Sequence, residues 1–201
     1  MPKQAWTQGL ASQKSAGTIF DTYTTAKTVL NAESLYTIGG NSLALGDNFV
    51  VNVDGSMTTL VTTPGTVTFQ VMLGTIVVWT SGAIQMNASS HVLLPWRLVV
   101  NLTAQLLNTG VGGAIAKFAG QGLLSGPMFT HTIAATDSWG RVSAADNFVS
   151  DVTMLVPVTS PALGTAFDST IAQIFDFWVG FSVSNAANRV RIDQYRLDGN
   201  N

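Results

Sequence analysis

The chain has 201 residues and a formal net charge of −2, and only 10% of its residues are charged, against about 25% in an ordinary soluble domain. The absence of cysteine excludes disulfide bonds and thiolate-based zinc or redox sites. The longest apolar runs, such as residues 177–183, are far shorter than the roughly 20 residues of a membrane-spanning helix, and residues 1–10 contain no apolar signal-peptide core. We therefore expect no membrane association and a surface that is uncharged or covered by partners, which favours an obligate oligomer.

Residues 1–33 differ in composition from the rest of the chain. They are rich in Gln, Ser, Thr, Ala and Lys, and their large apolar residues are isolated. We expect them to form an extended N-terminal arm, which becomes ordered only where it is tied to the body or to a neighbour, for example as a strand added to a sheet edge. The residues predicted to anchor this arm on a partner are Trp6, Ile19, Phe20 and Tyr23.

From residue 35 onward the sequence predicts β-strands. A strand over residues 49–53 ends at Asp54-Gly55, which is a strong hairpin signal. Residues 66–73 and 96–107 alternate apolar and polar side chains, with the period of two that half-buried strands have. Further strands are expected at residues 35–38, 57–62, 75–79, 83–87, 114–123, 151–158, 177–183 and from Val190 onward.

The pattern as a whole predicts the fold class. No segment keeps a helical period of 3.6, and turn residues separate the strands at frequent intervals. Many short strands with frequent turns are typical of sandwiches and barrels. We predict an all-β chain with a jelly-roll-like β-sandwich over residues 34–201, preceded by the arm.

The sequence shows no convergent catalytic or metal-binding motif. His91 and His131 have neither HxH nor HExxH spacing, and we expect both at the surface or at an interface. Composition alone leaves a Ser-His-Asp arrangement possible, but the chain has no GxSxG elbow. The glycine-rich residues 108–113 lack the GK[ST] of a phosphate loop, and Glu33 is the only glutamate. We expect no enzymatic activity, no metal and no cofactor.

The basic residues are too few for a nucleic-acid-binding face, because the chain has only nine Lys and Arg. The group Arg189, Arg191 and Arg196 alternates with Asp193 and Asp198 near the C-terminus. This alternation indicates ion pairs at a subunit contact better than phosphate binding. We therefore expect no nucleic-acid partner.

The tryptophans leave two hypotheses open. Trp79, Trp96, Trp139 and Trp178 could form a platform on which sugars stack. Trp178 alternates out of phase with Phe177 and Val179, so it points to the opposite face of its strand. We expect Trp178 to pack against another sheet or subunit, with carbohydrate binding as the alternative.

Several stretches resemble a pattern in structural proteins of tailed-bacteriophage virions. The resemblance covers about residues 50–201. Its first part is PGTVTFQVMLG at 64–74, followed by Val77-Val78 and Ser81-Gly82-Ala83. The other matching stretches are Pro95-Trp96-Arg97-Leu98 with the long strand that follows, Gly120-Gln121-Gly122, and Asp193-Gln194-Tyr195-Arg196-Leu197. These motifs are structural. The resemblance implies a jelly-roll or TNF-like sandwich that often associates as trimers, such as a capsid decoration protein, a head fibre or a minor structural protein.

Together these observations predict a non-enzymatic virion structural protein, most simply a capsid decoration or cement protein. We expect it to be made in the host cytoplasm, to form a homo-oligomer with a trimer favoured, and to contact other virion proteins such as the major capsid protein. The alternative is a receptor- or carbohydrate-binding module at a fibre or tail tip. A hydrolase has no motif in its favour.

Overall fold

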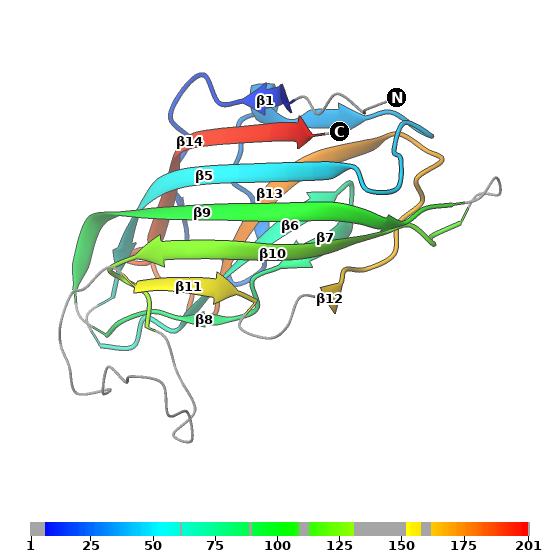
Figure 1. Ribbon diagram of the computed structural model, residues 1–201. Coiled ribbons are helices and arrows are strands. Elements are labelled where there is room, and N and C mark those ends of the chain that lie inside the picture. The colour runs from blue at the N-terminus through cyan, green and yellow to red at the C-terminus, as the bar shows by residue number, and fades with distance from the viewer. Residues whose placement is uncertain are drawn as a thin grey trace.

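The computed structural model describes residues 7–60, 62–88, 90–108, 113–130, 152–157 and 162–200. Within these ranges the chain forms fourteen β-strands and one short 3-10 helix, with no α-helix. The strands build two antiparallel sheets that pack face to face (Figure 1). The predicted all-β sandwich is confirmed. Over the same ranges, no helix is long and apolar enough to cross a membrane.

The front sheet in Figure 1, which we call the long sheet, has the strand order β1-β14-β5-β9-β10-β11. Two short strands extend it, because β2 (Phe20–Asp21) pairs with β14 and β12 (Ala162–Leu163) pairs with β10. The main strands are β1 (Thr7–Ser12), β5 (Asn48–Thr59), β9 (His91–Leu106), β10 (Lys117–Gly126), β11 (Val152–Val156) and β14 (Arg189–Asn200).

The second sheet, which we call the short sheet, has the order β3-β13-β6-β7. Both β3 and β4 pair with β13, and β8 pairs with β6. The 3-10 helix Ala32–Ser34 separates β3 from β4, so the two act as one interrupted edge strand. The strands are β3 (Lys27–Thr28), β4 (Tyr36–Ile38), β6 (Thr66–Leu73), β7 (Ile76–Thr80), β8 (Ile84–Gln85) and β13 (Gln173–Phe181).

The connectivity is that of a jelly roll. The chain changes sheet between β2 and β3, β4 and β5, β5 and β6, β8 and β9, β12 and β13, and β13 and β14. The strands β1-β14-β5-β9 of the long sheet therefore lie opposite the strands β3-β13-β6-β7 of the short sheet. Two sheets whose strands alternate along the chain in this way are typical of jelly rolls. The β10–β11 hairpin is an addition that widens the long sheet beyond this core.

The hairpin predicted at Asp54-Gly55 is wrong, because β5 runs through both residues without turning. Gly55 pairs with Trp96 of β9, and a Cβ atom at Gly55 would lie 2.3 Å from the carbonyl oxygen of Arg191 in β14 and 2.9 Å from Cζ2 of Trp96. The glycine therefore makes room for the backbone of β14 and for the indole within a strand instead of forming a turn. The separate strand predicted at residues 57–62 is the end of β5.

The core lies between the inner faces of the two sheets and is rich in aromatic rings. The ring of Phe69 stacks on Trp96 with centroids 4.9 Å apart, and on Phe177 at 6.0 Å. Trp79 is 5% exposed and covers Gly120 and Gly122 of the opposite sheet. A Cβ atom at Gly120 would lie 2.5 Å from Cδ1 of Trp79.

The N-terminal segment is tied to the body of its own chain. β1 and β2 pair with β14, and β3 pairs with β13. Phe20, Val29 and Leu30 are 6%, 5% and 8% exposed and belong to the core. The division of the chain into an arm and a body stays a prediction, but this packing indicates that the segment contributes to the stability of the sandwich.

The neighbours Phe20 and Ile19 provide a test of whether this segment stabilises the sandwich. We expect Phe20→Ala to lower the free energy of unfolding by about 3 kcal/mol, because truncating a buried aromatic side chain removes apolar burial and leaves a cavity. Ile19→Ala should change it by less than about 0.5 kcal/mol, since Ile19 is 55% exposed. Urea unfolding of both variants measures the difference. Equal stability of the two variants would show that the segment does not belong to the folded core.

Candidate interaction surface

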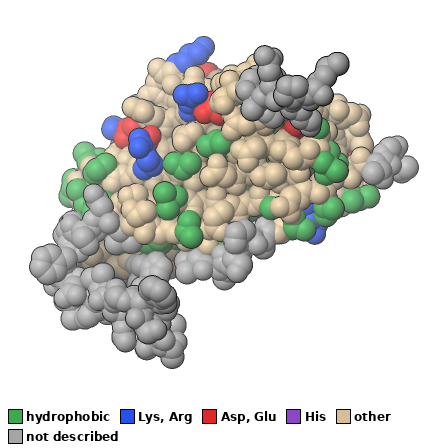
Figure 2. Space-filling view, viewed as in Figure 1, with side chains coloured by type: hydrophobic (Ala, Val, Ile, Leu, Met, Phe, Trp, Pro, Cys, Tyr) green, Lys and Arg blue, Asp and Glu red, His purple; other side chains and the backbone are tan. Residues whose placement is uncertain are grey.

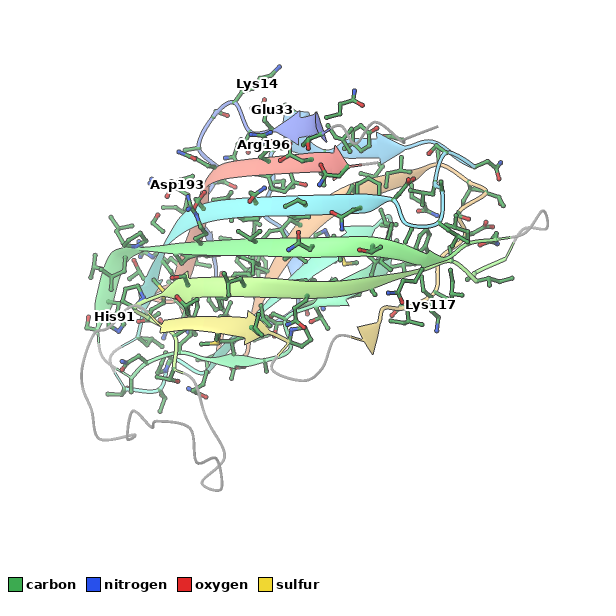
Figure 3. The ribbon with its side chains drawn as sticks, viewed as in Figure 1. Lys14, Glu33, His91, Lys117, Asp193 and Arg196 are labelled. Atoms are coloured by element: carbon green, nitrogen blue, oxygen red, sulfur yellow. The ribbon has the colours of Figure 1, made fainter. Side chains whose placement is uncertain are left out.

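In the part of the chain that the structure describes, no three His, Asp or Glu side chains come together in a group that could hold a metal ion. His91, expected at the surface or an interface, is only 5% exposed, because it begins β9 and pairs with Thr59 of β5. Burial lowers the pKa of His91, which favours the neutral imidazole. His131 lies outside the described residues. Figure 3 shows His91 and Lys117 at opposite ends of the molecule, while Asp193 and Arg196 lie along β14.

The tryptophan platform is not formed as the sequence suggested. Trp79 and Trp96 are 5% and 3% exposed and fill the core, and Trp139 lies outside the described residues. Trp178 points away from Phe177, as its alternation predicts, and is half-buried on the outer face of the short sheet. Its indole Nε1 donates a hydrogen bond to Oδ2 of Asp176 at 2.7 Å.

The carboxylate of Asp176 is already saturated by its own chain. Besides the Trp178 indole, it accepts hydrogen bonds from Oγ1 of Thr28 at 2.9 Å and from the Phe177 N–H at 2.7 Å. Burial raises the pKa of Asp176, and these hydrogen bonds oppose the rise. Asp176 therefore holds the Trp178 ring in place, and it leaves little capacity to bind a ligand.

The C-terminal arginines form ion pairs within the chain. Arg191 pairs with Asp193 at 2.6 Å and Arg196 pairs with Asp198 at 2.7 Å, both along β14. Arg196 is 60% exposed in its side chain, and pairs this exposed contribute roughly 0–1 kcal/mol. A subunit contact through these pairs stays a prediction. Figure 2 shows the charged side chains of this face gathered mainly along its upper left edge, while most of the face is uncharged.

A groove of about 410 Å³ lies at one end of the sandwich, where β14 begins, β5 ends and β9 begins. We call it the end groove. Its apolar wall consists of Ile19, Val92 and Leu93, whose exposed fractions are 55%, 68% and 62%. Arg189 and Arg191 also line it. The structure thus brings three of the residues predicted for an interface, Ile19, Arg189 and Arg191, to one place.

An irregular pairing of β5 with β9 creates the apolar wall. The register shifts between Met57 and Thr59, and Leu93 has a positive φ of 52°, which is costly for a bulky side chain. The N–H of Leu93 donates to Oγ1 of Thr58 at 3.1 Å. In a regular strand one of the two neighbours Val92 and Leu93 would face the core, but here both are exposed.

The end groove combines apolar walls with positive charge and one unpaired polar atom. Arg191 has Asp193 as its ion-pair partner, whereas Arg189 donates to the carbonyl oxygen of Ala186 and forms no ion pair among the described residues. Ser56, only 9% exposed, also lines the groove, and its Oγ has no hydrogen-bond partner in the described part of the chain. The groove can therefore accept apolar side chains that lie next to an anionic group.

The other predicted interface residues lie elsewhere. Phe20 stacks on Tyr23 with ring centroids 5.2 Å apart, and its burial in the core of its own chain leaves it unavailable as an anchor on a partner. Tyr23 is 42% exposed, with Nζ of Lys27 3.8 Å from its ring centroid. Trp6 lies outside the described residues. Sequence reasoning missed Val92 and Leu93, although an apolar run that breaks the alternation just before Pro95 could have indicated them.

Comparison with known proteins gives no assignment, because no family model, no curated protein and no solved structure matches this chain significantly.

The buried His91 predicts a pH dependence of stability. Because its pKa is below 6.5 in the folded chain, the unfolded chain binds more protons as the pH falls through 6.5, and the free energy of unfolding drops there. Urea unfolding at about pH 7.5 and about pH 5.5 measures this drop. We expect a smaller drop in His91→Gln, in which His131 and the carboxylates still titrate. An identical drop in both proteins would contradict the assignment to His91.

Proposed function

We propose that this chain is a non-enzymatic structural subunit of a tailed-phage virion, most simply a capsid decoration protein that docks on another virion protein through the end groove. The observation that carries the proposal is the groove itself, with three large aliphatic side chains more than half exposed beside two arginines. Clustered apolar exposure of this kind is typical of interaction sites. The placement in a phage virion depends on the sequence resemblance over residues 50–201.

The chemistry of the groove selects the kind of segment that it binds. Ile19, Val92 and Leu93 would be covered by aliphatic side chains of the partner, which removes apolar surface from water. Arg189, which lacks an ion-pair partner among the described residues, would bind a carboxylate next to them. We therefore assign the groove to a partner segment in which aliphatic residues are followed by Asp or Glu.

A second apolar surface supports association between copies of this chain. The cross-strand pairs Val99–Leu123 and Leu123–Leu155 place three apolar residues in one row on the outer face of the long sheet. Leu123 is 45% exposed and Leu155 is 60% exposed. Because the row is apolar and the charges beside it, Arg97 and Asp54, pair with each other, we assign it to the interface between copies of the chain in a trimer.

Binding to particles tests the docking. Particles assembled without this protein are mixed with the purified chain, and the bound copies are counted by quantitative gel and by imaging. We expect Val92→Asp to reduce binding at least about tenfold, which corresponds to 1.4 kcal/mol, because a charge would be buried among apolar groups. Leu45→Asp is the matched control, since Leu45 is 66% exposed but lies outside the groove. Wild-type binding by a folded Val92→Asp variant would reject the groove as the docking site.

Sedimentation tests the association between copies. The wild-type chain should sediment as a species three times the 21.2 kDa of one chain, and Leu155→Asp should shift it towards the monomer. Ile174→Asp, at a residue 47% exposed on the short sheet, should leave it unchanged. A wild-type chain that sediments only as a folded monomer in dilute buffer would count against the oligomer.

A further inference from the structure

We propose that a cleft at the other end of the sandwich binds a single sugar residue. The cleft has a volume of about 210 Å³ and lies where β14 ends and β5 begins, so it is separated from the end groove by the length of these two strands. We call it the amide cleft, because Gln8, Asn48 and Asn200 line it together with Asp47 and Tyr36. This inference does not depend on the phage placement or on the end groove.

The size and the floor of the amide cleft fit one ring. Its volume is below the roughly 300–1,000 Å³ of pockets for drug-sized ligands, and it equals several water molecules at about 30 Å³ each. Ile38 of the short sheet and Phe49 of the long sheet form an apolar floor and are 6% and 7% exposed. A pyranose ring has an apolar C–H face that could lie on such a floor while its hydroxyl groups reach the walls.

The polar side chains of the cleft are held in place by hydrogen bonds on paired strands. Asn200 of β14 pairs with Asn48 of β5. The side-chain Nδ2 of Asn48 donates to Oγ1 of Thr103 at 3.0 Å, and Nδ2 of Asn200 lies 3.5 Å from Oδ1 of Asn48. These contacts fix the orientation of both amides, which is the preorganisation that a binding site needs.

The buried atom left over after these contacts is a hydrogen-bond acceptor, whereas the Gln8 amide and the Tyr36 hydroxyl, which also line the cleft, can both donate and accept. Oδ1 of Asn200 is buried and has no partner within the described residues, an unfavourable state for a polar atom. Asp47 accepts the N–H of Ala44 at 2.7 Å through Oδ2, and its Oδ1 has no hydrogen bond to any described residue. A ligand that fits must therefore bring donors for Asn200 and Asp47, and groups that can also accept from Gln8 and Tyr36. Hydroxyl groups supply them without a net charge.

A protonated amine is the competing ligand, since Asp47 is the only charged side chain among the described residues that line the cleft. An ammonium group would satisfy one or two acceptors, but it would leave the apolar floor and the remaining amides without a role. The mixed lining, with donors and acceptors on the walls and an apolar floor, favours the sugar, whose hydroxyl groups both donate and accept.

The test titrates the full-length protein with galactose, glucose, mannose and N-acetylglucosamine, and separately with n-butylammonium, and follows backbone amide shifts by NMR. We expect at least one sugar to bind with a Kd of about millimolar, with the largest shifts at Asp47, Asn48 and Asn200. Asn200→Leu should weaken that sugar at least about tenfold. Asp47→Asn can still accept the Ala44 N–H, and it should reduce sugar binding only severalfold.

The controls separate this inference from the docking proposal. Val92→Asp, in the end groove, should bind the sugar as the wild type does, whatever its effect on docking. The inference is overturned if none of the four sugars shifts the cleft residues at about 50 mM. It is also overturned if Asn200→Leu binds as tightly as the wild type, or if only n-butylammonium binds and Asp47→Asn abolishes that binding.

Discussion

The packing of Trp79 onto glycines of the opposite sheet sets how closely the two sheets approach each other there. Trp79 of the short sheet lies on Gly120 and Gly122 of β10, and Trp96 of β9 lies beside Gly55 of β5. Glycine weakens a strand because it has no side chain to pack, but here any side chain would collide with an indole ring. A Cβ atom at Gly122 would lie 2.9 Å from Cζ2 of Trp79. Large rings therefore require small residues where they pack, both between the two sheets at Trp79 and within the long sheet at Trp96.

The same packing explains which parts of the fold could be predicted from the sequence. Alternation of apolar and polar residues is a local property, so residues 66–73 match β6 and the all-β class is correct. At Asp54-Gly55 the local sequence pattern led to a wrong prediction, because β5 continues through both residues. A glycine after an aspartate is compatible with a turn and also with a strand that makes room for its neighbours. Here the neighbours are Arg191 and Trp96, which lie far along the chain. Asp54 then pairs with Arg97 of β9 at 2.5 Å.

The candidate interaction surface could be predicted only in part for a related reason. Ile19, Arg189 and Arg191 were each expected at an interface, but their convergence depends on the strand order that places β14 beside β5 and β5 beside β9. Phe20 shows what amino-acid composition cannot predict, because it was expected to bind a partner but is buried in its own chain. Burial of a large apolar side chain contributes about 1.5–3 kcal/mol whether the covering surface is a partner or the same chain, so an isolated aromatic residue does not reveal which surface covers it.

The edges of the sheets explain how a chain with so few charges can confine association to defined surfaces. Exposed strand edges pair with other chains unless they are short, irregular, charged or covered. Here β1 covers the edge of β14 and has a register shift between Gly9 and Ala11, and β13 is covered by β3 and β4, which have two and three residues. These edges are therefore protected by irregularity instead of charge. The exposed apolar surface that remains includes the end groove and the row on the long sheet, where side-chain shape and charge can select a partner better than backbone pairing can.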